Sequence, residues 1–155
     1  MTTVLPREDT ERRRDVSLLY LIKQVELAVR QALEEVVEPA ALTAVQYTAL
    51  TVLRRHPGIT SAQLARNSFV RTQTMAEMVA FLLDRRLVDR VRDESNRRQY
   101  LLSLSHHGNA VVDSLSDPVA AIEHRMLTGL DAEEIELLRT SLLRCRRSLT
   151  EAPLH

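Results

Sequence analysis

The sequence predicts a mainly α-helical protein that carries one small β-hairpin, and three observations lead to this fold class. Apolar residues recur every three or four positions over most of the chain, which is the spacing of amphipathic helices. Three segments have the residue order of a capping box, which marks the first turn of a helix. One further segment has two partly alternating apolar runs around a charged, turn-prone tip, as a β-hairpin has.

The first three predicted helices precede the hairpin. Apolar positions from Leu18 to Val36 predict a long helix that Pro39 ends. The capping box Thr43-Ala-Val-Gln46 opens a second helix, which continues to about Arg55. The capping box Thr60-Ser-Ala-Gln63 then opens a short third helix after a Pro-Gly stop.

A fourth helix and the hairpin complete the middle of the chain. Apolar spacing predicts the helix from about Val70 to about Arg86. Residues 87–92 and 99–104 are the predicted strands. Residues 93–98, with the sequence Asp-Glu-Ser-Asn-Arg-Arg, form the predicted tip between them.

The C-terminal part returns to helical spacing from Ser105 onward. Pro118 predicts a kink or an early break there, because proline removes a backbone hydrogen bond. The capping box Asp131-Ala-Glu-Glu134 opens the last helix. The first helix and the last two carry more apolar residues than a small domain can cover, so we expect two copies of the chain to share them.

The charge distribution separates the middle of the chain from its ends. The net charge is zero, but the segment from Arg54 to Arg98 contains ten Arg and five acidic residues, which gives +5. The other residues include eleven basic and sixteen acidic ones, which gives −5. A basic centre between acidic ends is expected where only the centre meets phosphates, although a solvated helical surface has the same composition.

Several classes of function find no support in the sequence. No apolar run approaches the roughly 18 residues of a membrane span. The N-terminus shows no signal segment, so we expect a cytoplasmic protein with no membrane partner. One cysteine, Cys145, excludes an intrachain disulfide framework and a four-thiolate zinc site. Gly-rich phosphate loops and catalytic serine motifs are absent, so we expect no enzyme, no catalytic residues, no metal site and no cofactor.

Two short helices with a tight break, followed by a basic hairpin, predict a winged helix-turn-helix over residues 43–105. We expect residues 1–42 and 106–155 to form a helical dimerisation region. In a winged helix-turn-helix the second helix enters the major groove, and an Arg-tipped hairpin can reach the neighbouring minor groove. The alternative is that these side chains only cap a helix and form a solvated charged turn, without contacting DNA. The predicted DNA-contacting residues are Arg71, Thr72, Gln73, Thr74, Glu77, Arg90, Arg92, Arg97 and Arg98.

The motifs of this segment resemble those of the multiple-antibiotic-resistance regulator (MarR) family. The matching residues are 42–47, Leu50, Leu53, 57–60, 64–65, Leu82, 87–90, 93–98, 102–105 and Gly108. The resemblance implies a homodimer with one winged domain on each side, a pseudo-palindromic operator and an effector pocket between the dimer helices and the winged domain. Under that resemblance Tyr20, Tyr47 and His56 are candidate residues for a small aromatic or anionic effector, although core packing explains the two tyrosines equally well.

The sequence departs from the family pattern at six positions, one of which is Ser105 in place of the usual threonine. Arg86 and Phe69 stand where the family favours glycine, and Arg71 stands where a capping serine is common. Glu77 replaces a frequent arginine on the helix that enters the major groove, called the reading helix below. Asn96 replaces the aspartate that pairs with the wing arginine, so we expect Arg98 to be less restrained than in the family.

We therefore expect a homodimeric, sequence-specific DNA-binding transcription regulator, a repressor that a small effector releases from its operator. Two alternatives stay open at this point. One is a helical protein-interaction dimer that binds no DNA, and the other is an architectural DNA-binding regulator that responds to no ligand.

Overall fold

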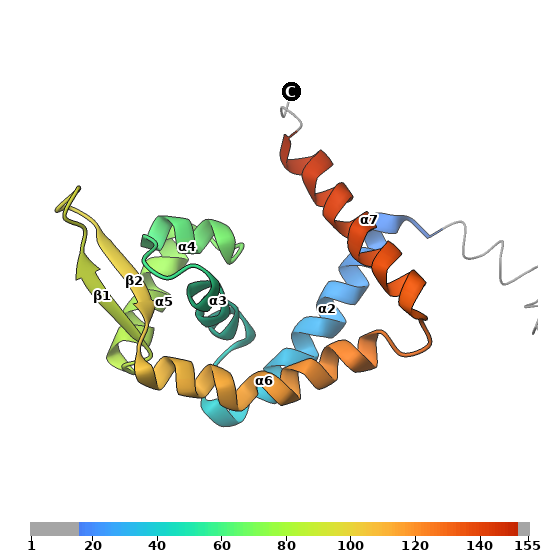
Figure 1. Cartoon of the computed structure of the whole chain (residues 1–155), viewed down its shortest axis with the longest axis horizontal. Coiled ribbons are helices and arrows are strands. Elements are labelled where there is room, and N and C mark those ends of the chain that lie inside the picture. The colour runs from blue at the N-terminus through green and yellow to red at the C-terminus, as the bar shows by residue number, and fades with distance from the viewer. Residues whose placement is uncertain (1–15, 152–155) are drawn as a thin grey trace, which may run out of the picture. The chain divides into compact units, whose positions relative to one another are not determined.

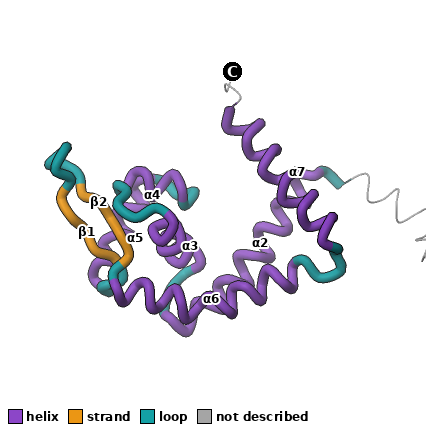
Figure 2. Tube along the Cα trace, in the orientation of Figure 1, coloured by secondary structure: helices purple, strands orange, loops and turns teal. Residues whose placement is uncertain are grey.

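The computed structural model describes residues 16–151. Residues 1–15 and 152–155, the outer ends of the predicted dimerisation region, lie outside the described part. By its internal contacts the chain divides into two units, one up to Val119 and one from Ala120. Figures 1 and 2 show helices joined to one antiparallel hairpin in the described residues, and the predicted fold class is confirmed.

The elements follow the predicted order. The first unit contains α2 (Leu18–Val37), the 3-10 helix η1 (Glu38–Ala40), α3 (Ala44–Arg55), α4 (Ser61–Asn67), α5 (Thr72–Asp84), β1 (Val88–Arg92), β2 (Tyr100–Leu104) and most of α6 (His106–Met126). The second unit contains the end of α6 and α7 (Ala132–Glu151).

Three helices begin at the predicted capping boxes. At the start of α3, the N–H of Gln46 donates to the Thr43 hydroxyl at 3.2 Å, and the N–H of Thr43 donates to the Gln46 side chain at 3.0 Å. These bonds satisfy backbone donors that a helix start otherwise leaves without partners. The same reciprocal bonds join Thr60 to Gln63 before α4 and Asp131 to Glu134 before α7.

The first unit has a hydrophobic core to which α3, α4, α5 and the base of the hairpin contribute. Its largest side chains with essentially no exposed surface are Leu50, Leu53, Leu64, Met75, Leu82, Leu87, Leu102 and Val37. Tyr47 lies in the same core, and burial raises the pKa of its phenol. Helix α5 is therefore anchored on one face by Met75 and Leu82 while its other faces stay available.

The hairpin is attached to the core at its base and extends beyond it at its tip. One of its faces consists of the cross-strand pairs Val88–Leu104, Arg90–Leu102 and Arg92–Tyr100. Leu102 is 2% exposed, whereas Arg92 and Tyr100 are exposed. The backbone of Leu102 also bonds to Ile59 and Gly58 at 2.8 Å each, which ties the hairpin to the loop before α4.

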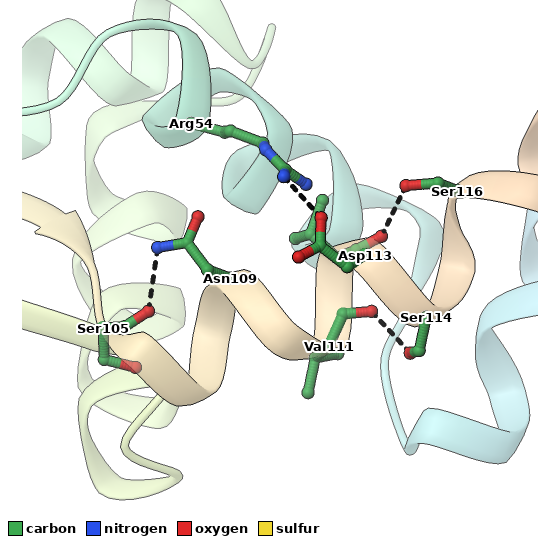
Figure 3. Close-up of polar contacts among 8 residues, drawn as sticks. Arg54, Ser105, Asn109, Val111, Asp113, Ser114 and Ser116 are labelled. Carbon is green, nitrogen blue, oxygen red and sulfur yellow. Dashed lines mark hydrogen bonds and ion pairs between the residues drawn. The ribbon is translucent and has the colours of Figure 1, made fainter.

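The first part of α6 is held to α3 by an ion pair (Figure 3). The carboxylate of Asp113 accepts from the guanidinium of Arg54 in α3. In the first turn, the side chain of Asn109 donates to the carbonyl of Ser105 at 3.1 Å. Helix α6 continues through Pro118 as one element, so the predicted early break is absent. Proline removes one N–H donor, and the turns on either side of it stay helical.

Helices α2 and α7 each expose an apolar face. On α2, Leu18 and Leu19 are 75% and 76% exposed, and on α7, Leu142 and Leu149 are 47% and 74% exposed. Among the described residues no single helix is long and apolar enough to cross a membrane. Taken together, α2–η1 and α3 have the length and composition of a membrane span, but the two segments are bent by 83° relative to each other. Contiguous exposed apolar surface of this kind marks a contact with another molecule.

Candidate nucleic-acid interface

The first turn of α5 is a polar surface on a fixed base. Met75 is fully buried, whereas Thr72, Gln73 and Thr74 are exposed. Helix α4 packs against α5, so the pair forms the predicted helix-turn-helix (Figure 1). The side chains that the sequence predicts to meet base edges therefore project from a helix whose position the core determines.

The start of α5 has no side-chain cap. Arg71 occupies the N-cap position with an extended backbone, and its side chain makes no capping hydrogen bond. The first backbone N–H groups of α5 therefore have no side-chain acceptor. A helix N-terminus in this state attracts anions such as phosphate oxygens.

Two departures from the family pattern fall at left-handed backbone positions. Phe69, in the turn before α5, has φ of 59°, and Arg86, just before β1, has φ of 55°. Glycine adopts this conformation freely, whereas another residue is strained by about 1 kcal/mol or more. The geometry explains why glycine is favoured at both positions. Here the Phe69 side chain is also 87% exposed.

The hairpin of β1 and β2 is the wing of the domain. Its four predicted DNA-contacting arginines are all exposed, but their surroundings differ. Arg92 donates through Nη1 to the carbonyl of Arg97 and through Nη2 to the Tyr100 hydroxyl, both at 2.8 Å. The guanidinium of Arg90 lies 4.6 Å from the centre of the Tyr100 ring. Among the described residues, no hydrogen bond or ion pair holds the guanidinium of Arg97 or Arg98.

The side chain of Asn96 is used inside the tip. Its Oδ1 accepts from the backbone N–H of Arg98 at 3.2 Å. Next to it, Oδ1 of Asp93 accepts from the Ser95 hydroxyl at 2.7 Å and from the Ser95 N–H at 2.9 Å, and these bonds lower the pKa of the Asp93 carboxyl. Asn96 thus shapes the backbone of the tip, which leaves the Arg98 guanidinium unrestrained by it.

A groove brings the reading helix and the wing together. It has a volume of about 420 Å³ and is lined by Thr72 and Ala76 of α5 and by Arg90, Arg98 and Tyr100 of the hairpin. Predicted contact residues from both elements therefore lie on one surface. Glu77 is exposed on α5, and no cation among the described residues lies within ion-pair distance of it.

Two residues with contacts that the sequence did not predict are Tyr100, in the groove, and Arg85, at the far end of α5. Tyr100 was assigned only to a strand, although its ring and hydroxyl contact two arginines. Arg85, at the end of α5, donates to the carbonyls of Ala41 and Ala40 at 2.6 Å and 3.0 Å. Since the acceptors of Arg85 are backbone carbonyls more than forty residues away, no local motif marks this residue.

The three candidate effector residues do not come together. Tyr47 is a core residue, Tyr20 is 58% exposed on α2, and His56 is exposed at the end of α3. A pocket of about 380 Å³ lies elsewhere in the first unit, between α2, the start of α3 and the turn that contains Phe69. None of the three candidates lines it.

Metal ligands do not gather in the part of the chain that the structure describes. No group of three or more His, Cys, Asp or Glu side chains there could hold a metal ion. Cys145 is a free, exposed thiol on α7.

A helix-turn-helix with an exposed polar reading turn, joined to an arginine-rich hairpin, defines a winged helix-turn-helix protein. A family model described as "MarR family" matches residues 42–100. The HTH-type transcriptional repressor Rv2887 of Mycobacterium tuberculosis (strain ATCC 25618 / H37Rv) is 30% identical over 120 residues, which cover 77% of this chain and 86% of the relative. The transcriptional regulator HosA of Escherichia coli is 30% identical over 96 residues, 62% of this chain and 71% of the relative.

Solved structures show the same fold. The transcriptional repressor CouR, bound to a 23-mer DNA duplex, is 26% identical with a TM-score of 0.76, and the match covers 94% of this chain and 100% of that one. The transcriptional regulator SlyA is 24% identical with a TM-score of 0.80, over 88% of this chain and 96% of that one. The chain belongs to the MarR family and is a transcription regulator, which confirms that it is not an enzyme.

Proposed function

We propose that this regulator binds DNA as a homodimer, represses from a pseudo-palindromic operator and is released by a small effector. The observation that carries the proposal is the surface formed by the uncapped, polar first turn of α5 and the exposed arginines of the hairpin. The names of the relatives, which include a transcriptional repressor, and the DNA-bound CouR structure support it. A regulator of this kind works where the DNA is, in the cytoplasm.

The reading helix supplies the base contacts in this proposal. Gln73 can form hydrogen bonds with adenine, Thr74 can contact a thymine methyl group, and Arg71 can form hydrogen bonds with guanine. Thr72 lies beside the N–H groups at the start of α5, which suit a phosphate oxygen. Glu77 can accept from the N4 amino group of cytosine, since no described cation occupies it.

The wing supplies contacts of a second kind. Arg97 and Arg98 extend from the tip with free guanidinium groups, and Arg90 lies closer to the core on the face with Tyr100. Phosphate contacts fix the position of a protein on DNA without reading sequence, and an arginine in a narrow minor groove reads shape. We assign Arg97 to phosphate and Arg98 to the minor groove.

Substitutions in the reading helix test this function. Gln73→Ala and Thr74→Ala are each expected to weaken operator binding by about 1–3 kcal/mol, because each removes a base contact, and to change binding to random DNA little. Fluorescence anisotropy with the operator and with a random duplex of equal length measures both. Thr140→Ala, an exposed change on α7, is the matched control for Thr74→Ala. Equal losses on both duplexes would mean that these side chains contact phosphates.

The apolar faces of α2 and α7 support the homodimer. A C2 dimer buries the same patch on each subunit, so an interface at either helix would cover the exposed leucines of that helix in both subunits. We therefore assign residues 1–42 and 106–155 to dimerisation and residues 43–105 to DNA binding. Two winged domains related by a two-fold axis fit the two half-sites of a pseudo-palindrome.

The pocket between α2, α3 and the Phe69 turn is the proposed effector site. Val29, Leu33 and Val70 give it apolar walls, and the exposed ring of Phe69 lies at the same site. Arg30 also lines it, paired with Glu26 at 3.4 Å. Glu26 lines the pocket as well, so its polar part is this ion pair. The apolar walls suit a small aromatic molecule, and an anionic one would take the place of Glu26 beside Arg30. Because the pocket is next to the turn that leads into α5, a bound molecule can shift the reading helix.

A further inference from the structure

We propose that Arg92 and Tyr100 form an internal brace that positions the wing tip, and that Arg92 serves this role in place of a DNA contact. This inference rests on the proposed function, since it concerns how the wing presents Arg97 and Arg98. The brace replaces a tie between the side chains of residues 96 and 98, which Asn96 does not make.

The register of the hairpin creates the brace. Arg92 and Tyr100 are directly opposite each other in the ladder, and Arg90 lies two residues away on the same face of the same strand. The two guanidinium groups lie 4.6 Å and 5.1 Å from the centre of the Tyr100 ring. One aromatic ring thus offsets the repulsion between two cations that have no carboxylate partner among the described residues.

The hydrogen bonds of Arg92 extend this contact to the tip. Its Nη2 donates to the Tyr100 hydroxyl at 2.8 Å, which fixes the guanidinium plane over the strand pair. Its Nη1 donates to the carbonyl of Arg97 at 2.8 Å. That carbonyl belongs to the peptide group that joins Arg97 to Arg98. Holding this peptide group sets the direction in which both arginine side chains leave the backbone.

The other bonds of the tip are local. The Asn96 side chain accepts from the N–H of Arg98 at 3.2 Å, at the other end of the same peptide group, but Asn96 belongs to the tip and therefore does not tie the tip to the strands. The N–H of Asp93 donates to the carbonyl of Gln99 at 3.1 Å, and the N–H of Gln99 donates to the carbonyl of Asn96 at 2.9 Å. These backbone bonds close the turn and join it to the strand pair next to Arg92 and Tyr100. In the described residues, Arg92 is the strand side chain that bonds to the tip, so it adds a side-chain tie between the strands and the peptide group of Arg97 and Arg98.

The chemistry of Arg92 matters for this role. A guanidinium presents its donors in a planar fork, so it can reach two acceptors in different directions while stacking on a ring. A lysine at the same position keeps the charge but loses the fork. Tyr100→Phe keeps the ring and removes the acceptor. These two substitutions therefore separate the brace from charge and from aromatic packing.

The first arm of the test needs no DNA. Backbone 15N relaxation of the free full-length protein reports the order of the tip amides of Glu94, Asn96 and Arg97. Arg92→Lys and Tyr100→Phe are expected to lower the order parameters of these amides from rigid values near 0.85 toward 0.6. Arg90→Lys is the matched control in this arm, because Arg90 stacks on the same ring without bonding to the tip. Unchanged tip order in both variants would overturn the brace.

The second arm is a double-mutant cycle on operator binding. Tyr100→Phe is expected to weaken binding by about 2- to 10-fold, the range for one lost hydrogen bond. In a protein that already carries both Arg97→Ala and Arg98→Ala, the same change is expected to cost less than about 2-fold, because the brace acts through those two arginines. Equal losses in both backgrounds would show that the Tyr100 hydroxyl acts on DNA independently of Arg97 and Arg98 and would contradict the proposal.

The two experiments distinguish failure of the proposed function from failure of the brace. If the wild-type protein bound operator and random DNA equally, the proposed function would fail. The relaxation result would still decide whether Arg92 and Tyr100 order the tip. Loss of tip order together with additive losses on DNA would retain the brace as a structural feature and remove its role in positioning Arg97 and Arg98.

Discussion

Replacing Gly108 by alanine is expected to destabilise the protein by about 3 kcal/mol, which is the upper range for an overpacked core position. Gly108 lies in the first turn of α6, where a Cβ atom would lie 2.0 Å from the carbonyl oxygen of Leu87 and 2.9 Å from its carbon. Both are backbone atoms of a fully buried residue and cannot move aside cheaply. In an ordinary helix the same change stabilises by about 1 kcal/mol, so even the sign is informative.

The hydrogen bonds around Gly108 explain why the packing is so close. The Ser105 hydroxyl donates to the carbonyl of Arg86 at 2.6 Å and accepts from the N–H of Gly108 at 2.8 Å, and the N–H of Ser105 donates to Leu87 at 3.1 Å. These bonds hold the start of α6 against the residues that lead into β1, so the same contact orients the wing.

Urea unfolding followed by circular dichroism at a fixed protein concentration measures the effect of Gly108→Ala. Asp117→Ala, at an exposed position of the same helix, is the control and is expected to change stability by less than about 0.5 kcal/mol. A Gly108→Ala protein as stable as the wild type would show that α6 does not pack on the Leu87 backbone.

A charge on the apolar face of α7 is expected to abolish the proposed dimer. Leu142 is 47% exposed in the single chain, so glutamate is tolerated there in a monomer but would be buried without a partner in a dimer interface. Leu142→Glu is expected to halve the mass measured by light scattering. It should weaken operator binding by about 100-fold or more, because the two winged domains no longer bind as one linked pair.

Thr140→Glu adds the same charge to the opposite side of α7 and is expected to leave the dimer and its DNA affinity intact. A Leu142→Glu protein that stays dimeric would move the interface away from this face of α7. A monomeric variant with wild-type affinity would instead show that one winged domain binds the operator alone.

The sequence predicted the elements well because their signals are local. A capping box needs residues three positions apart, and the bonds at Thr43, Thr60 and Asp131 formed as expected. The hairpin was predicted from alternation and a polar tip, and its strands begin and end within a residue of residues 87–92 and 99–104. The exposed reading turn followed from the same reasoning, since the buried positions of α5 fix which side faces outward.

The missed features depend on contacts between distant residues. Arg85 bonds to the carbonyls of Ala40 and Ala41, and the pocket that we propose for the effector joins α2 to a turn before α5, so neither has a spacing that could be read from the sequence. Arg92 was predicted as a DNA contact because it lies in the basic hairpin, and we propose that it positions the tip instead. Its bonds to Arg97 and Tyr100 emerge only when the cross-strand register is known.

Binding of the wild-type protein to its own upstream DNA tests the central claim most directly. We expect two chains to bind one pseudo-palindromic site at physiological salt, with at least about 1,000-fold preference over a shuffled duplex of the same length and composition. Titration followed by anisotropy, with stoichiometry from light scattering of the complex, gives both quantities. Equal affinity for the upstream and shuffled duplexes would contradict sequence-specific regulation by this surface.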